Sequence, residues 1–283
     1  MHPSVSRAVL GASLCGILTG GCATPASPTA SEASAASERG PALTASGFSG
    51  VVMAVSGPRI SGAKLTFVKE DCSVTRTVTS GNKGVYRIDL ALGRYVVSAV
   101  HPDYEPYSSA PGFFVVSRSG YATGNFVLKK KRNPLPLTTV LLLRHAEKGP
   151  TQPDDRQTPL SPDGVQRAEE LVHVAEKAGV TTLYATQYLR TQQTVQNLAT
   201  RLGKPVRRVC DSDLQGLVAE ILSQHAGEVV LIASHSPAVP MIVQAFGGTG
   251  GAVGDEFDNL FVLTVYDYGR AKVANLQYGR ASP

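Results

Sequence analysis

The sequence has few cysteines, little net charge and no long apolar run beyond its N-terminus. Four of its 283 residues are cysteine, and neither Cys72 nor Cys210 has a second Cys or a His at metal-ligand spacing, which argues against a zinc site. The formal net charge of +5 is modest and does not indicate binding to nucleic acid. No segment after the N-terminus is apolar over enough residues to cross a membrane. The length instead suggests two globular domains.

The first 22 residues are typical of an export signal. Arg7 provides the positive charge, and the apolar stretch 8–19 is too short to span a membrane as a stable helix. It ends in Leu18-Thr19-Gly20-Gly21-Cys22, which resembles a bacterial lipobox and implies that Cys22 carries a lipid. The alternative is a plain secretory signal with an incidental cysteine.

Residues 23–46 are rich in Ala, Ser, Thr and Pro, so they cannot bury a core and are predicted to form a flexible tether. Ala23 and Thr24 carry no acidic signal for retention at an inner membrane. We therefore expect a protein of the cell envelope, held by its lipid at the outer membrane or the periplasmic face.

Cys72 and Cys210 are the cysteines that remain after the signal, and they fall in different predicted domains. A disulfide between them would require a close domain interface. We interpret them as separate thiols.

Residues 47–128 are predicted to form an all-β sandwich domain, because short alternating runs recur between turns. The runs are 50–55, 63–68, 73–79, 86–90, 95–100, 113–117 and 125–128. The pattern Gly84-Val85-Tyr86-Arg87-Ile88-Asp89-Leu90 followed by Gly93-Arg94-Tyr95-Val96-Val97 resembles the carboxypeptidase regulatory-like, transthyretin-type domain. The resemblance implies a structural or adhesive module.

Residues 129–137 begin with four basic residues and continue as a proline-containing linker. From residue 138 to 283, apolar strands alternate with amphipathic helices, which predicts an α/β domain with a largely parallel sheet and helices on both faces. The predicted strands are 138–143, 182–185, 205–209, 229–234, 260–266 and 272–277. The predicted helices start near 162, 189, 214 and 237.

Cationic and imidazole side chains stand at the carboxyl ends of these strands or at the starts of the helices that follow. Arg144 and His145 follow the first strand, Arg190 lies in the first turn of the second helix, and His235 follows the fourth strand. Ligands of open α/β sheets bind at this edge, and helix N-termini favour phosphate there. Singly each residue has an ordinary surface or capping role, but together the four predict a phosphate pocket.

The same segments resemble the histidine phosphatase (phosphoglycerate mutase-like) superfamily. The matching motifs are Arg144-His145-Ala146-Glu147, Leu160-Ser161-Pro162-Asp163-Gly164, Tyr184-Ala185-Thr186-Gln187-Tyr188-Leu189-Arg190-Thr191 and Ser234-His235-Ser236. The resemblance implies that His145 attacks phosphorus to form a phosphohistidine, while Arg144, Arg190 and His235 hold the phosphoryl oxygens. It implies no cofactor and no metal, because cationic side chains neutralise the phosphoryl charge.

The proton donor for the leaving alcohol is less well marked. Many members of the family place a Glu after the third strand, whereas this chain has Asp211 and Asp213 in the segment 210–216. We expect Asp213 to be the catalytic acid, with Glu147 as the second candidate, since a carboxylic acid must lie within hydrogen-bond reach of the leaving oxygen.

The sequence thus predicts a lipid-anchored, metal-independent phosphatase acting on a small phosphorylated substrate, with the loops 149–158 and 247–258 setting specificity. The alternative is a lipoprotein that binds anionic groups, or serves in adhesion, with weak or absent turnover. The intact pair of His145 and His235 favours the enzyme.

Overall fold

A computed structural model describes residues 45–117, 120–132 and 134–282. The predicted signal segment with Cys22, and the predicted tether up to residue 44, lie outside the described residues. Over the described parts of the chain, no helix is both long and apolar enough to pass through a membrane. The described residues belong to one compact unit.

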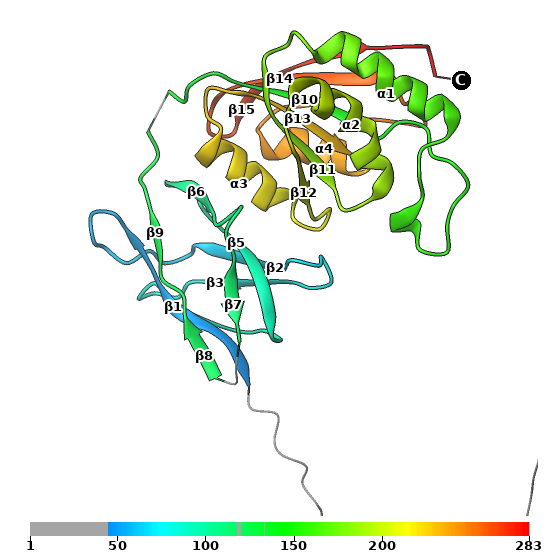
Figure 1. Cartoon of the computed structure of the whole chain (residues 1–283). Helices are drawn as coiled ribbons and strands as arrows, with labels where there is room; N and C mark the ends of the chain where they lie inside the picture. Colours follow the sequence, from blue (N-terminus) through cyan, green and yellow to red (C-terminus); the bar gives the residue numbers. More distant parts are fainter. Residues whose placement is uncertain (1–44, 118–119, 133, 283) are drawn as a thin grey trace, which may run out of the picture. The chain divides into compact units, whose positions relative to one another are not determined.

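The part before the linker consists of β-strands in two sheets (Figure 1). The strands are β1 (Ser46–Ala54), β2 (Lys64–Lys69), β3 (Thr75–Thr79), β4 (Val85–Asp89), β5 (Gly93–His101), β6 (Tyr104–Ser108), β7 (Phe114–Val116), β8 (Gly120–Thr123) and β9 (Phe126–Leu128). One sheet has the order β4-β1-β8, with β9 also paired to β1, and the other has the order β3-β2-β5-β6, with β7 also paired to β5.

The two sheets share one buried cluster. Phe48 on β1 and Phe67 on β2 come from different sheets and stack with their ring centroids 5.8 Å apart. Alternate residues of β4 enter the same cluster, because successive side chains of a strand point to opposite faces. This arrangement explains the period-two pattern of the sequence. The resemblance to a carboxypeptidase regulatory-like domain stays a prediction.

The structure contains two strands in this part that the sequence analysis did not predict, β6 and β8. β6 contains Pro106, which cannot donate a ladder hydrogen bond. It is tolerated because β6 is the edge strand of its sheet. β8 is four residues long, begins at Gly120 and pairs with β1 in parallel.

The part after the linker is a mixed α/β fold, as predicted. Its sheet has the order β12-β11-β13-β10-β14-β15. The first four strands pair in parallel, β14 pairs antiparallel with β10, and β15 pairs antiparallel with β14. The strands are β10 (Thr138–Arg144), β11 (Val180–Thr186), β12 (Val206–Val209), β13 (Val229–Ser234), β14 (Asn259–Asp267) and β15 (Arg270–Gln277). The helices are α1 (Pro162–Ala175), α2 (Leu189–Leu202), α3 (Leu214–Gln224) and α4 (Ala238–Ala245), with a short 3-10 helix at Asp155–Gln157.

Helices cover both faces of this sheet, which is why β10 is apolar without alternation. Val140 and Leu142 belong to the buried cluster that contains α3 and α4 residues. Leu141 and Leu143 belong to the cluster that contains α1 and α2 residues. Because each face meets a different helical layer, every position of the strand is selected for burial.

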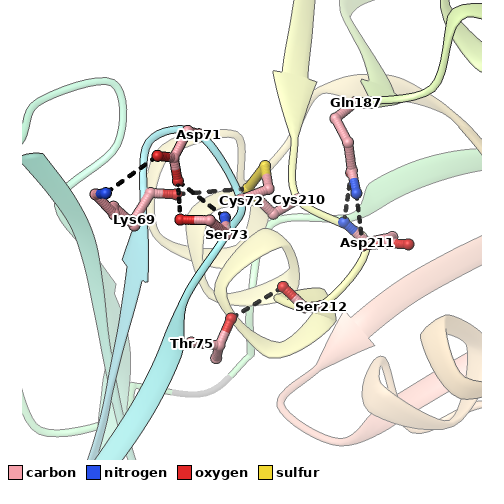
Figure 2. Close-up of a disulfide and its surroundings, with 9 residues drawn as sticks. All are labelled: Lys69, Asp71, Cys72, Ser73, Thr75, Gln187, Cys210, Asp211 and Ser212. Atoms are coloured by element: carbon pink, nitrogen blue, oxygen red, sulfur yellow. Dashed lines mark hydrogen bonds and ion pairs between the residues drawn. A yellow bond between two sulfur atoms is a disulfide. The ribbon is translucent and has the colours of Figure 1, made fainter. Parts of the chain in front are cut away.

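Cys72 and Cys210 form a disulfide with their Cα atoms 5.5 Å apart (Figure 2). The interpretation as separate thiols is therefore wrong. The sequence pattern gives no sign that the β2–β3 turn lies against the segment after β12, and this tertiary contact brings the two cysteines together. Thr75 and Ser212 meet in the same region, with their hydroxyl oxygens 2.9 Å apart.

Candidate active site

The parallel pairing of β10 with β13 brings the two predicted histidines together. Arg144 and Ser234 are register partners at the ends of these strands, so His145 and His235 each stand one residue beyond. The backbone N–H of His145 donates to the carbonyl oxygen of Ser234 at 2.8 Å. The two imidazole rings meet edge to face with their centroids 5.3 Å apart.

One ring nitrogen of His145 is bonded to the backbone. Nδ1 lies 2.8 Å from the carbonyl oxygen of Ala146, and because a carbonyl only accepts, Nδ1 must carry the hydrogen. Nε2 then holds the free lone pair when the ring is neutral. Burial lowers the pKa of His145 to about 3, so the ring is neutral near pH 7.

Thr194 holds the start of this loop. Its hydroxyl accepts a hydrogen bond from the backbone N–H of Ala146 at 2.9 Å and donates to the carbonyl of Arg190 at 2.7 Å. Ala146 is fully buried, so this position tolerates only a small side chain. The loop after β10 is therefore tied directly to the first turn of α2.

Arg190 lies in that first turn, as predicted. Its side chain is buried, and its guanidinium carbon lies 4.5 Å from the ring centroid of Tyr188. The Tyr188 ring packs edge to face on His235 with centroids 4.7 Å apart. Tyr188 thus links the arginine to the second histidine through contacts that restrict both side chains.

His235 is fixed by a hydroxyl of β11. Its Nε2 lies 3.0 Å from Oγ1 of Thr186, which in turn lies 2.9 Å from Oγ1 of Thr191. Burial lowers the pKa of His235 to about 4, and the charge of Arg190 acts in the same direction. Both histidines are therefore neutral near pH 7, and the arginines supply the positive charge of the site.

His145, Arg190 and His235 line one cavity of about 450 Å³. Its other lining residues are Tyr188, Asp211, Leu214, Ser236, Pro237, Ala238 and Met241. A volume in this range suits a small-molecule ligand. Asp211 is the one carboxylate among these lining residues.

Arg144 does not line this cavity. Its Nη1 donates to the carbonyl oxygens of Gly254 and Glu256 at 3.0 and 3.3 Å, and its guanidinium stacks on Phe257 at 4.0 Å. Phe257 also faces His145, with ring centroids 6.0 Å apart. The loop 247–258 therefore holds the Arg144 guanidinium.

Arg190 is also held by a loop. Its Nη1 and Nη2 donate to the backbone oxygen and the Oδ2 of Asp155, at 2.9 and 3.0 Å. The Nε atoms of Arg144 and Arg190 are buried without a hydrogen-bond acceptor. A buried N–H without a partner is costly, and of these two arginines only Arg190 lines the cavity. An oxyanion on Arg190 competes with Asp155.

The structure places Glu147 outside the cavity. Its carboxylate forms an ion pair with Arg167, whose Nε and Nη2 donate to it at 2.7 to 3.0 Å. Burial raises the pKa of Glu147, but the hydrogen bonds and charge of Arg167 offset this, so the net pKa is lowered. Arg167 also donates to the carbonyls of Tyr278 and Arg280. The ion pair with Arg167 argues against Glu147 as the acid, and its role as second candidate stays a prediction.

Asp213, the predicted catalytic acid, also lies elsewhere. It is the N-cap of α3, where its Oδ1 accepts from the backbone N–H of Gly216 at 2.9 Å. It lines a different cavity of about 350 Å³, together with Cys72 and Cys210. Burial raises its pKa to about 7. Capping turns the side chain toward its own helix, which argues against the catalytic role; that role stays a prediction.

Three residues of the site had no individual role predicted from the sequence: Asp211, Tyr188 and Asp155. The capping pattern of Asp213, directly before an apolar run, could have excluded it and left Asp211. Tyr188 was within a quoted motif but was given no role. The contact of Asp155 with Arg190 has no sequence signal, since 35 residues separate them.

In the described residues, no group of three His, Cys, Asp or Glu side chains is placed to hold a metal.

Residues 140–215 match the model of the histidine phosphatase superfamily (branch 1), which confirms the predicted resemblance for that segment. The 8-oxo-(d)GTP phosphatase of Mycolicibacterium smegmatis is 39% identical over 74 residues, which are 25% of this chain and 23% of that protein. The chain thus spans about a quarter of the length of that curated relative.

Two solved structures match the chain at low sequence identity. The protein histidine phosphatase SixA complexed with tungstate is 17% identical, with 49% of this chain and 96% of that chain covered and a TM-score of 0.40. A mycobacterial glucosyl-3-phosphoglycerate phosphatase complexed with VO3 is 16% identical, with coverages of 48% and 96% and a TM-score of 0.39.

Proposed function

We propose that the part of the chain from residue 138 to 283 is a phosphatase that hydrolyses small phosphomonoesters through a phosphohistidine on His145. The observation that carries this proposal is the state of that imidazole. Its Nδ1–H is bound to the carbonyl of Ala146, its pKa is about 3, and it shares a cavity with Arg190 and His235. A buried, neutral imidazole with a free Nε2 lone pair is a nucleophile at neutral pH.

In the first step, Nε2 of His145 forms a bond to phosphorus while the bond from phosphorus to the ester oxygen breaks. The electron pair of that bond leaves with the alcohol oxygen, which takes up a proton from an acid in the cavity or from water. Arg190 and His235 bind the phosphoryl oxygens, and Asp155 must give up its hold on Arg190.

In the second step, water attacks phosphorus and His145 leaves. The bond from Nδ1–H to the Ala146 carbonyl persists in the phosphohistidine, so the phosphorylated ring is cationic and a good leaving group. We propose no metal for either step, because the Arg190 guanidinium offsets the phosphoryl charge. The products are inorganic phosphate and the free alcohol.

We also propose export and lipid attachment at Cys22, which would place the enzyme in the cell envelope with a membrane partner. The export signal, the small residues before Cys22 and the tether support this proposal. The disulfide adds support, because disulfides persist mainly in oxidising compartments. The two-sheet part before the linker would then be a structural or adhesive module of the carboxypeptidase regulatory-like type.

The test of the enzyme is a comparison of the full chain with His145→Ala on a panel of phosphate esters. The panel includes oxidised nucleoside triphosphates, because the curated relative is named for such a substrate. We expect His145→Ala to lose at least about a thousandfold in kcat/KM. Rapid quenching with labelled substrate should trap acid-labile phosphate on His145.

His173→Ala is the matched control, because His173 is an exposed histidine on α1. It should retain full activity. Full activity in His145→Ala would refute the proposal. A protein that binds vanadate at this site but hydrolyses no ester would instead support an anion-binding lipoprotein.

A further inference from the structure

The disulfide joins a preformed turn to the segment that carries the carboxylate of the active-site cavity. On one side is the turn between β2 and β3. Asp71 accepts from the backbone N–H of Ser73 at 2.9 Å and pairs with Lys69 at 3.2 Å. Cys72 has a φ of 59°, a conformation that residues other than glycine rarely adopt. Its sulfur is thus presented by a rigid turn.

On the other side, Cys210 directly precedes Asp211. The backbone N–H of Asp211 donates to Oε1 of Gln187 at 2.9 Å, and Nε2 of Gln187 donates to Oδ1 of Asp211 at 2.7 Å (Figure 2). Gln187 is followed by Tyr188, the ring between Arg190 and His235. Cys210 is therefore the neighbour of Asp211 in the chain, and Asp211 is hydrogen-bonded to Gln187, the neighbour of Tyr188.

The position of Asp211 in the cavity matters for the ester. Phosphate would lie between His145, Arg190 and His235, so the alcohol part must extend along the remaining lining, where Asp211, Leu214 and Met241 stand. In its protonated form, the Asp211 carboxyl group can give its proton to the leaving alcohol oxygen and take up another from water, provided that the side chain is held in place.

We propose that the Cys72–Cys210 disulfide positions the Asp211 carboxyl group as proton donor to the leaving group, so that turnover of esters with poor leaving groups depends on the redox state of the disulfide. This inference rests on the proposed phosphatase function. Cys72 and Cys210 are positioning residues, since they act through Asp211 and touch no substrate. The part of the chain before the linker would thereby control the site of the other part.

The switch operates by thiol–disulfide exchange with a dithiol reductant. One thiolate of the reductant attacks a sulfur of the disulfide, and the other protein sulfur leaves as a thiolate. The second thiol of the reductant then displaces the protein sulfur, which gives two protein thiols and a cyclic disulfide. Access is available, because both cysteines are partly exposed and line the cavity of about 350 Å³.

The experiment compares the full-length protein before and after treatment with a dithiol, after peptide mapping has established the Cys72–Cys210 crosslink. Two substrates are used, an alkyl phosphate and an aryl phosphate with a good leaving group. We expect reduction to lower kcat/KM about tenfold for the alkyl ester and less than about twofold for the aryl ester. Cys72→Ser should behave like the reduced protein.

Two variants separate the proposed link from general loosening. In Asp211→Asn, reduction should cause no further loss, because the group on which the disulfide acts is already gone. Gln224→Ala is the control: Nε2 of Gln224 donates to the carbonyl of Ala110 at 2.6 Å, which is another contact between the same parts of the chain. This variant should keep the wild-type ratio of kcat/KM for the alkyl ester to kcat/KM for the aryl ester.

Each other outcome has a definite meaning. An oxidised protein that hydrolyses neither ester contradicts the proposed function itself. An active protein in which reduction changes neither ester, or slows both equally, overturns the positioning role. The same holds if Asp211→Asn remains sensitive to reduction, or if the crosslinked peptide is absent. Should Cys72→Ser not fold, the dithiol comparison decides alone.

Discussion

Replacing Asp213 with Asn should change how the stability of the protein depends on pH while leaving the phosphatase activity intact. Asp213 is 8% exposed, and burial raises its pKa from 3.8 to about 7. The folded state therefore binds this proton more tightly than the unfolded state. Such a group contributes stability that is fully present below pH 4 and is lost as the pH rises to about 7.

The size of the effect follows from the shift of the pKa. A difference of about 3 units, at about 1.4 kcal/mol per unit, amounts to about 4 kcal/mol between pH 4 and pH 8. Asn does not titrate, and its amide oxygen can still accept the cap hydrogen bond from Gly216. The free energy of unfolding of the Asn variant should therefore rise relative to that of the wild type by up to about 4 kcal/mol as the pH rises from 4 to 8.

The assay is urea unfolding of both proteins at intervals from pH 4.5 to 8.5. The buried histidines titrate in both proteins, so their effect cancels in the difference of unfolding free energies. Asp213→Ala serves as the control, because it removes the cap as well and should lie about 1 kcal/mol below the Asn variant at every pH. Parallel curves for Asn and wild type would refute the burial argument. A large loss of activity in the Asn variant would return Asp213 to the site.

Three further predictions follow from the contacts and the sequence. Glu147→Gln leaves the buried Arg167 without its partner, so it should lower the free energy of unfolding in urea by about 3 kcal/mol with little change in activity. Glu176→Gln should lower it by less than about 1 kcal/mol, because its partner Arg201 is exposed. Equal losses in the two variants would contradict this prediction. Burial holds the pKa of His145 at about 3, so the fall of kcat/KM on the acid side should have its midpoint well below pH 6.5, after correction for the ionisation of the ester. A midpoint at pH 6.5 would mean that the His145 ring is hydrated. Cys22→Ala should move the protein from the membrane to the soluble fraction, and unchanged retention would place the anchor elsewhere.

The sequence by itself determined the α/β alternation and the ends of the strands that carry the histidines. Buried parallel strands must be continuously apolar, so the abrupt stop after Leu143 and the one after Ala233 mark the edge of the sheet. Since parallel neighbours end at the same edge, His145 and His235 had to meet if β10 and β13 paired. Arg190 followed from the start of a helix, because local capping and propensity define that position.

Only the tertiary structure decided which carboxylate faces the cavity. Asp211 and Asp213 differ by two positions, and the outcome depends on α3, which takes Asp213 as its cap, and on Gln187, which holds Asp211. The partner of Glu147 was likewise set by packing, because Arg167 also binds carbonyls near the end of the chain.

The disulfide shows the same limit most clearly. Cys72 and Cys210 are 138 residues apart, and a pairing at that distance depends on how the β2–β3 turn meets the segment before α3. Short-range patterns record turns, caps and burial, since these are fixed by neighbours in the chain. Contacts between distant segments depend on the shape of both surfaces, which no local pattern contains.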